Sequence, residues 1–484
     1  MAFPKHATAA LAAILALAGC SLQPLYERPP LPVASSFPEI AASPPPRDDG
    51  SVHAADIGWQ DFLADPRLRR LVEIALQNNR DLRVAMLNVA EVQAQYRLQG
   101  AASFPQVTGG ITGTQSRTPG SVQPSGKTLV SHARSAELSV AWEIDLFGRL
   151  RSLSDAAFQQ YLASAHARQA AEILLVSQVA DQYLATLAFD DQLTVTKKTL
   201  EAAREALKIV RRRFEVGTAS ELDVAESRTL VEQAEVNESE QLRLRAQAED
   251  ALVLLIGGPM PGDLPPPVRL DGQAIRDDVP AGLPSELLSR RPDILQAEAQ
   301  LRAENADIGA ARAAFFPRIS LTGAFGTESA TLGGLFSAGS RAWSFVPSLA
   351  APIFDAGANR ANLQIATLQR DIGIAHYEKT IQTAFKEVAD GLAARTTYAD
   401  QLAASQRLAS TQQRRLSLAQ VRYESGVNGY LDVLAAQTDL YNAQLALVTM
   451  RLHHLSSLVD LYRALGGGWI RATGDTPRLA GEAQ

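Results

Sequence analysis

The pattern R-[FY]-E-x-G-x-x-x-x-L-D-V occurs twice in this chain, first from Arg213 to Val224 and again from Arg422 to Val433. A second pair of segments, residues 71–105 and 283–317, repeats at nearly the same separation, and both segments end in Phe-Pro. A repeat of about 210 residues is much longer than a solenoid module. We therefore expect two equivalent halves that form one pseudo-symmetric body.

The first 20 residues resemble an export signal that ends in a lipidation site. An apolar run from Ala7 to Ala18 is too short to span a bilayer, and Leu17-Ala18-Gly19-Cys20 resembles a bacterial lipobox. This predicts a signal peptide over residues 1–19 and a covalent lipid on Cys20, which is the only cysteine of the chain. Ser21 after the cysteine favours the outer membrane. The alternative is an ordinary secretory signal in which Cys20 has no role.

The hydrophobic period changes along each half, which predicts both helices and strands. Residues 20–60 are rich in proline and predict an extended segment. Helical patterning begins at Asp65-Pro66, an N-cap followed by proline, and runs to about residue 102. From about 104 to 147 the period falls to two, which indicates a β-hairpin with one apolar and one polar face. Its apolar face contains Ala136, Leu138, Val140, Trp142, Ile144 and Leu146.

Long helices follow the first hairpin and a similar second hairpin, predicted at about residues 316–354. Residues 149–214 lack proline and glycine and predict one helix on the order of 100 Å long. A helix of the same length is expected over residues 359–424, and return helices run to about 256 and 465. Gly217 and Gly426 suit the left-handed position that ends a helix, and Ser220 with Asp223 resembles a capping box.

These elements divide the chain into segments with expected boundaries. The two halves are residues 61–256 and 290–465, and a proline-rich linker over 257–289 joins them. The tail, residues 466–484, begins with three glycines and should be loop-like and partly disordered. The expected fold class is mainly α with β.

Four strands per chain are too few to close a barrel. An open sheet edge in lipid leaves backbone groups unpaired at several kcal/mol each, so membrane strands require several chains. Three chains would supply twelve strands, a number found in outer-membrane barrels, and twelve helical columns for a hollow cylinder. The chain has no run of 18 apolar residues after the signal, which argues against a helical membrane protein.

Several motifs together resemble one known family. They are the lipobox, the early Trp59, Phe62 and Pro66, the strand end Ala141–Gly148, and both R-[FY]-E-x-G tips. In this order they resemble the outer-membrane efflux factors of the TolC/OprM family, in the lipoprotein (NodT-like) branch. The resemblance implies a homotrimer with a β-barrel in the outer membrane and a long α-helical barrel in the periplasm. It also implies a periplasmic adaptor and an inner-membrane pump as partners, with efflux of small solutes or drugs, as in multidrug resistance.

The resemblance also assigns roles to residues near the two hairpin tips. The tips are expected to contact the adaptor through Val216, Gly217, Thr218, Ser425, Gly426 and Val427. The periplasmic gate is expected to use Asp432, with Asp223 as its first-half equivalent and Leu431 and Tyr430 as an apolar constriction. Each assignment has a plainer alternative, because the glycines also cap helices and acids at a helix start are favoured by the helix dipole.

The sequence gives no sign of an enzyme or of a cofactor beyond the lipid on Cys20. It has no phosphate-binding loop, no nucleophile elbow and no zinc motif, and the adjacent His453 and His454 lie about 100° apart on a helix. A formal charge of -6 with mixed signs gives no indication of nucleic acid as a partner. Two other functions stay open: an exit duct for secreted protein, and a coiled-coil lipoprotein that tethers the outer membrane, although a tether needs no two-faced strands.

Overall fold

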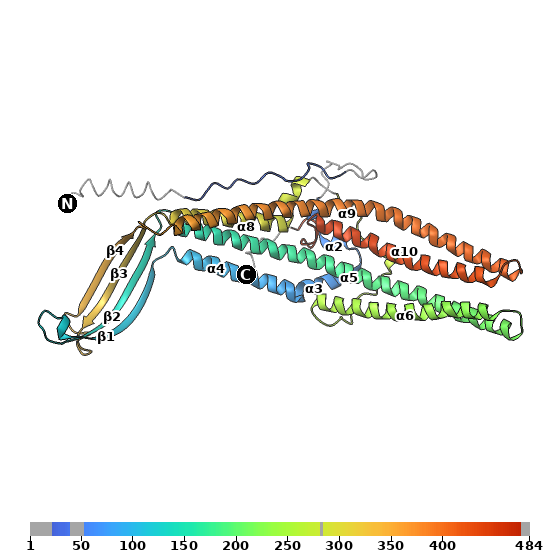
Figure 1. Ribbon diagram of the computed structural model, residues 1–484, viewed down its shortest axis with the longest axis horizontal. Helices are drawn as coiled ribbons and strands as arrows, with labels where there is room; N and C mark the ends of the chain where they lie inside the picture. Colours follow the sequence, from blue (N-terminus) through green and yellow to red (C-terminus); the bar gives the residue numbers. More distant parts are fainter. Residues whose placement is uncertain (1–21, 39–52, 281–283, 476–484) are drawn as a thin grey trace. The chain divides into compact units, whose positions relative to one another are not determined.

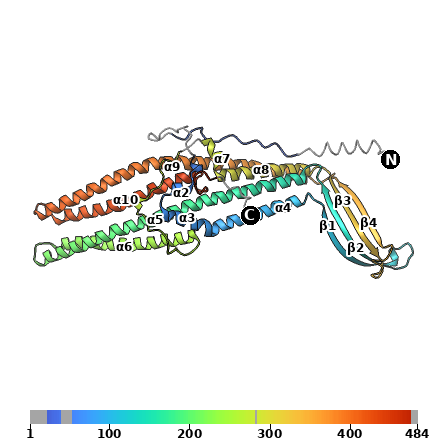
Figure 2. The same cartoon turned by 180° about the vertical axis from the view of Figure 1, so that it is seen from behind.

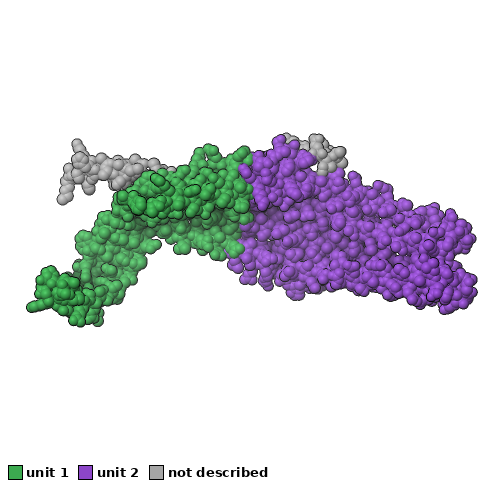
Figure 3. Space-filling view, in the orientation of Figure 1, with its two compact units in different colours: residues 1–30, 88–164, 296–377 green, residues 31–87, 165–295, 378–484 purple. Residues whose placement is uncertain are grey.

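The computed structural model describes residues 22–38, 53–280 and 284–475. The predicted signal peptide and Cys20 lie outside these residues. The chain forms two compact units (Figure 3). Unit 1 comprises Met1–Pro30, Asn88–Ser164 and Gln296–Tyr377, and unit 2 comprises Leu31–Leu87, Ala165–Leu295 and Glu378–Gln484.

Unit 1 contains a four-stranded antiparallel sheet in the order β1-β2-β3-β4 (Figure 1). The strands are β1 (Gln106–Thr118), β2 (Leu129–Ile144), β3 (Arg318–Ser329) and β4 (Arg341–Ala350). A short 3-10 helix, η2 (Gly120–Val122), lies in the first hairpin loop. Strands β2 and β3 pair across the two halves of the chain, which makes the two hairpins one sheet.

The pairing register gives the sheet one apolar and one polar face. Residues directly opposite in an antiparallel pair share a face, and alternate residues along a strand change face. Leu138 pairs with Gly109 and Phe325, and Phe325 pairs with Trp343, so one face is apolar across all four strands. On the other face, serine and threonine hydroxyl groups hydrogen-bond between strands at Thr108–Ser139, Thr112–Ser135, Ser116–Ser131 and Ser320–Ser348.

Two residues explain how the second hairpin tolerates a poor strand sequence. Pro347, which cannot donate to a ladder, lies in β4, an edge strand of the sheet, opposite Leu321. Gly326 lies so close to the carbonyl oxygen of Ala136 that a Cβ atom would be 2.1 Å from it. The glycine therefore permits β3 to approach β2 at this point.

The N-terminal segment of unit 1 is extended and held against α8 (Pro292–Ala313). Arg28 forms an ion pair of 2.7 Å with Glu298, and Tyr26 donates a hydrogen bond of 3.3 Å to the same carboxylate. Asn305 donates to the carbonyl oxygen of Pro24 at 2.8 Å. These contacts satisfy polar groups that an extended chain cannot satisfy by itself.

Unit 2 is dominated by two helical hairpins that lie side by side in both views (Figures 1 and 2). The first hairpin joins α5 (Arg149–Glu215) to α6 (Glu221–Ile256), and the second joins α9 (Ala358–Glu424) to α10 (Tyr430–Ala464). The shorter elements are α2 (Trp59–Phe62), α3 (Pro66–Asn78), α4 (Arg80–Ala101), α7 (Leu287–Arg290) and the 3-10 helices η1 (Ala54–Asp56), η3 (Leu270–Gly272) and η4 (Pro284–Glu286).

Capping explains where several of these helices start and stop. Asp65 accepts hydrogen bonds from the backbone N–H groups of Arg67 and Leu68, as expected for the N-cap of α3. The helical pattern predicted to run on to about residue 102 is interrupted at Asn79. The Asn79 side chain accepts from the N–H of Leu82 and donates to the carbonyl oxygen of Leu255, so it starts a new helix, α4.

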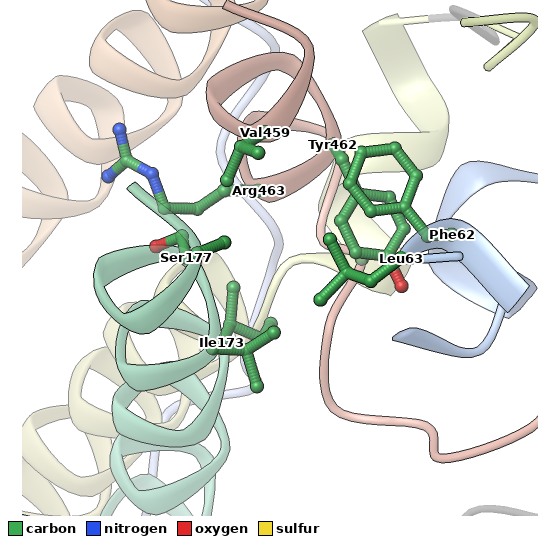
Figure 4. A pocket seen from close by; sticks show the side chains of 10 residues that line it. Phe62, Leu63, Ile173, Ser177, Val459, Tyr462 and Arg463 are labelled. Carbon is green, nitrogen blue, oxygen red and sulfur yellow. The ribbon is translucent and has the colours of Figure 1, made fainter. Parts of the chain in front are cut away.

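The core of unit 2 contains a small apolar cavity of about 10 Å³ between Ile173, Val459 and the stacked rings of Phe62 and Tyr462 (Figure 4). The two ring centroids are 3.9 Å apart, and the Tyr462 hydroxyl donates to the carbonyl oxygen of Ile57 at 2.6 Å. Burial raises the pKa of Tyr462. The cavity is too small and too apolar to hold more than one water, so it is a packing defect rather than a ligand site.

The structure describes the tail as far as residue 475. It lacks regular secondary structure over residues 466–475, as expected, and the hydrogen bonds of this stretch were not predicted. Trp59 donates its N–H to the carbonyl oxygen of Ile470 at 2.9 Å, and Gly58 donates to the Thr473 hydroxyl at 3.1 Å. These backbone contacts fix the tail against the start of α2.

Within the described residues, no helix combines the length and the apolar character needed to cross a membrane.

Candidate functional site

The first hairpin tip reverses the chain through Gly217, whose φ is 76°. The N–H of Gly217 donates to the carbonyl oxygen of Phe214 at 2.9 Å, and the N–H of Thr218 donates to that of Arg213 at 2.8 Å. Ser220 then caps α6 in a complete capping box with Asp223. The Asp223 carboxylate accepts from both the backbone N–H and the hydroxyl of Ser220, each at 2.8 Å.

The second tip has the same backbone path and different side-chain contacts. Gly426 has φ of 73°, and Val427 donates to the carbonyl oxygen of Arg422 at 2.9 Å, as Thr218 does to Arg213. The N-cap of α10 is Gly429, which has no side chain for capping. The Asp432 carboxylate instead accepts from the Asn428 amide at 2.5 Å, and Asn428 accepts from Arg422 at 2.8 Å.

Both tips expose apolar side chains next to these turns. Val216, which precedes Gly217, is 73% exposed, and Val427, which follows Gly426, is 64% exposed. Leu431, adjacent to Asp432, is 56% exposed. Exposed aliphatic side chains on a polar helical surface are candidates for contact with another protein.

Tyr430 is placed differently from its neighbours, since only 9% of it is exposed. It belongs to a buried cluster between the two hairpins, here called the tip cluster, and burial raises its pKa. The tip cluster consists of Leu200, Ala203, Leu207, Val210, Leu230, Val231, Ala234, Tyr430, Val433 and Leu434. Tyr430 therefore packs inside one chain, where it joins the second hairpin to the first.

Polar contacts continue this connection on both sides of the tip cluster. Arg213 lies over the ring of Tyr423, 4.9 Å from its centroid, and also donates to the Tyr423 hydroxyl. The rings of Tyr423 and Tyr430 are 5.4 Å apart. Further along, the Tyr441 hydroxyl hydrogen-bonds both Thr196 and Asn237 at 2.9 Å, so one side chain links α10 to α5 and α6.

A cavity of about 400 Å³ lies between the two hairpins beyond the tip cluster. Its lining includes Lys198 and Asp191 from α5 and Gln437 and Leu440 from α10. The hairpins are thus in close contact at the tip cluster, and beside it an open space remains between them next to the hydrogen bonds of Tyr441.

The acids of the strand region are partly engaged in local contacts. Glu143 forms an ion pair of 2.9 Å with Arg149, and Asp145 accepts from the N–H of Arg151 at the start of α5. Glu137 lies on the polar face, opposite Gly110 and Gly326. No group of three or more metal-ligating side chains occurs among the residues that the structure describes.

Comparison with known proteins identifies the family. The profile of the outer membrane efflux protein family matches the chain twice, over residues 71–258 and 283–467. The chain is 46% identical over 465 residues to the toluene efflux pump outer membrane protein TtgC of Pseudomonas putida, covering 96% of both chains. It is 45% identical over 469 residues to the outer membrane protein OprJ of Pseudomonas aeruginosa, again covering 96% of both.

Solved structures agree with this result. The fold matches a Pseudomonas aeruginosa membrane protein at 44% identity with a TM-score of 0.85, covering 92% of this chain and all of that one. It matches the open-state MtrE outer membrane channel of Neisseria gonorrhoeae at 38% identity and a TM-score of 0.85, covering 94% of this chain and all of that one. The chain belongs to the outer membrane efflux protein family. It is an outer-membrane channel component of an efflux system.

These findings confirm the predicted family, fold class, function and outer-membrane localisation. The lipoprotein branch and the lipid on Cys20 stay predictions, as do the roles assigned to the tip residues. The contacts Arg213–Tyr423 and Asn428–Asp432 were not predicted. The duplicated motif contains a sequence signal for the Arg213–Tyr423 contact. Arg213 is the first residue of one copy, and Tyr423 is the aromatic residue of the other copy.

Proposed function

We propose that three copies of this chain form a passive exit duct for small solutes. The observation that supports this most strongly is the open sheet with one face that has an apolar band across all four strands and one hydroxyl-rich face. Strands β1 and β4 have free edges in one chain, and twelve strands from three chains would pair every edge. The apolar face would meet lipid and the polar face would line the bore.

The partners of the duct are a periplasmic adaptor and an inner-membrane pump. The adaptor contacts the tips at Val216, Gly217 and Thr218 and at Ser425, Gly426 and Val427, where exposed valines flank the turns. The pump supplies the energy, and this chain has no catalytic role. Relatives are named for efflux of toluene, solvents or antibiotics, which favours small solutes over a secreted protein as cargo.

The segment boundaries expected from the sequence belong to the same proposal. Residues 1–19 are removed, Cys20 carries the lipid, and residues 61–256 and 290–465 are the two halves on either side of the linker.

The gate lies at the second tip. Three copies of Asp432 around one axis would repel each other and attract cations. Leu431, which is exposed, provides the apolar surface of the constriction, whereas Tyr430 acts from within the tip cluster by holding the hairpins together. Asp223 contributes less, because its carboxylate is engaged in the capping box.

Opening requires the two hairpins of one chain to separate or tilt near their tips. The Asn428–Asp432 hydrogen bond and the Arg213–Tyr423 contact would break or rearrange in that motion. The cavity between the hairpins leaves room for it.

The test is single-channel recording of the purified full-length protein in a planar bilayer, with its mass measured in parallel. We expect a trimer that conducts in discrete, cation-preferring steps. A folded trimer without conductance would support the alternative, a tether lipoprotein. A folded monomer would contradict a barrel built from the strands of three chains.

A further inference from the structure

The register of the sheet separates charges as well as apolar and polar side chains. All acidic residues of the four strands, Glu137, Glu143 and Glu328, lie on the polar face. The charged residues on the apolar face are all basic. These are Arg117 on β1, His132 and Arg134 on β2, and Arg341 on β4, here called the basic rim.

The basic rim lies next to the hairpin loops and extends over six residues along the sheet, from Arg341, level with Ala136, to Arg117, level with Val130. The apolar band runs from Ile144, paired with Ile319, to Ala136, paired with Ile111, which is about 27 Å along a strand at 3.4 Å per residue. Arg134, paired with Gly113, is the next residue of this face beyond Ala136. Arg341 is the next residue of this face beyond Trp343, which is 77% exposed.

Among the residues that the structure describes, no acidic side chain pairs with the arginines of the basic rim. Arg149, at the other end of β2, is paired with Glu143. Within the described part of the chain, Arg117, Arg134 and Arg341 form no ion pair. The apolar face has no acidic side chain that could pair with these cations. An anion from the molecules that surround this face could pair with them instead.

Arg134 and Arg341 are spaced for neighbouring anions rather than a single one. They lie on the two strands that flank β3, about 10 Å apart across the sheet, and are displaced by two residues along it. A guanidinium group binds a phosphate oxygen pair through two parallel hydrogen bonds. The lipid leaflet that surrounds a membrane sheet presents phosphates at the depth where an apolar band ends.

We propose that the basic rim binds the phosphorylated headgroups of anionic lipids in the leaflet next to the hairpin loops. The proposal rests on the proposed function, which places the apolar face against lipid. An arginine near an anionic membrane surface increases binding about five-fold. Three arginines in each chain therefore give the sheet a preference for anionic lipid that the apolar band alone does not provide.

The test uses full-length protein in vesicles that contain brominated phosphatidylglycerol or brominated phosphatidylcholine. Bromine quenches the fluorescence of tryptophan in contact with lipid, and Trp142 and Trp343 lie on the apolar face. We expect the wild type to prefer phosphatidylglycerol about five-fold or more at low salt. The preference should fall towards one in the variant Arg117→Gln/Arg134→Gln/Arg341→Gln and in the wild type at high salt.

Two control variants separate charge from damage to the fold. Arg318 lies on the polar face of β3, so Arg318→Gln should keep the full preference. The triple variant with lysine in place of each arginine should keep most of it. Equal quenching of the wild type by both lipids, or a full preference in the glutamine variant, would overturn the basic rim. An absence of quenching by either lipid would overturn the membrane placement itself, and with it the proposed function.

Discussion

The two hairpin tips share one backbone and differ in how their side chains are used. Both turns contain a glycine with positive φ, and both close with the same pair of backbone hydrogen bonds. Ser220 of the first tip corresponds to Gly429 of the second, and Ala219 corresponds to Asn428. With these two differences, the aspartate that occurs in both copies serves the helix cap as Asp223 and accepts a hydrogen bond from the Asn428 amide as Asp432.

The duplicated unit thus has the same backbone turn and different side-chain contacts in its two copies. The glycine and the adjacent backbone bonds maintain the turn in both copies. The cap at the first tip fixes the start of α6, while the second tip uses its aspartate in a contact within the loop and relies on Tyr430 for anchoring. This difference supports the proposal that the second tip, and not the first, contains the gate.

The largest expected effect comes from removing the anchor of the second tip. Tyr430→Ala should destabilise the packing of α10 on α5 and α6 by about 3 kcal/mol, because a buried aromatic side chain leaves a cavity. The adjacent control, Leu431→Ala, should change it by less than about 0.5 kcal/mol, since Leu431 is exposed. Hydrogen-exchange mass spectrometry of α10 peptides measures both. Equal protection of the α10 amides in the two variants would contradict an anchoring role for Tyr430.

A smaller effect tests what the tips have in common. Gly217→Ala and Gly426→Ala should each cost about 1–2 kcal/mol through the left-handed backbone alone, because a Cβ atom at either position would meet no other atom within 4 Å. The two costs should be equal. Gly429→Ala, where φ is -73°, serves as the control without left-handed strain and should cost only about 0.5 kcal/mol, because alanine is a poorer N-cap than glycine. Unequal costs at Gly217 and Gly426, measured by hydrogen exchange at the tips, would show that the two turns are not equivalent.

Substitutions at the two N-caps should have the smallest effect on stability and should distinguish the two tips most clearly. Ser220→Ala should weaken the first turn of α6 by about 1 kcal/mol. Gly429→Ser, which introduces the missing cap at the second tip, should strengthen the first turn of α10 by only a few tenths of a kcal/mol. Exchange of the first-turn amides reports both changes. A loss of protection in Gly429→Ser would mean that serine cannot draw Asp432 away from Asn428.

Much of the fold could be predicted because the spacing of apolar and polar residues along the sequence indicates the type of each element. The repeat, the period-two segments and the long stretches without proline and glycine indicate both hairpins and both long helices. The apolar face of the sheet also follows from alternation alone. The glycine turns and the Ser220–Asp223 capping box could be predicted because each depends on residues within a few positions of each other.

The rest depends on contacts between segments that are distant in sequence. The tail is held by backbone groups of Gly58 and Trp59, which no side-chain pattern reveals. The sequence places Tyr430 at the start of a helix. Its burial could not be predicted, because it depends on the packing of α10 beside α6. The basic rim required the register of four strands, since the basic residues of three separate strands form a group only when the pairing is known.

We propose that the second tip gates the channel and that the first does not. Single-channel conductance of Asp432→Ala and Asp223→Ala, each compared with the wild type, tests it most directly. We predict that Asp432→Ala gives a larger conductance or a weaker cation preference, while Asp223→Ala conducts as the wild type does. Equal changes in both variants, or a change in Asp223→Ala alone, would contradict the division of tasks between the tips.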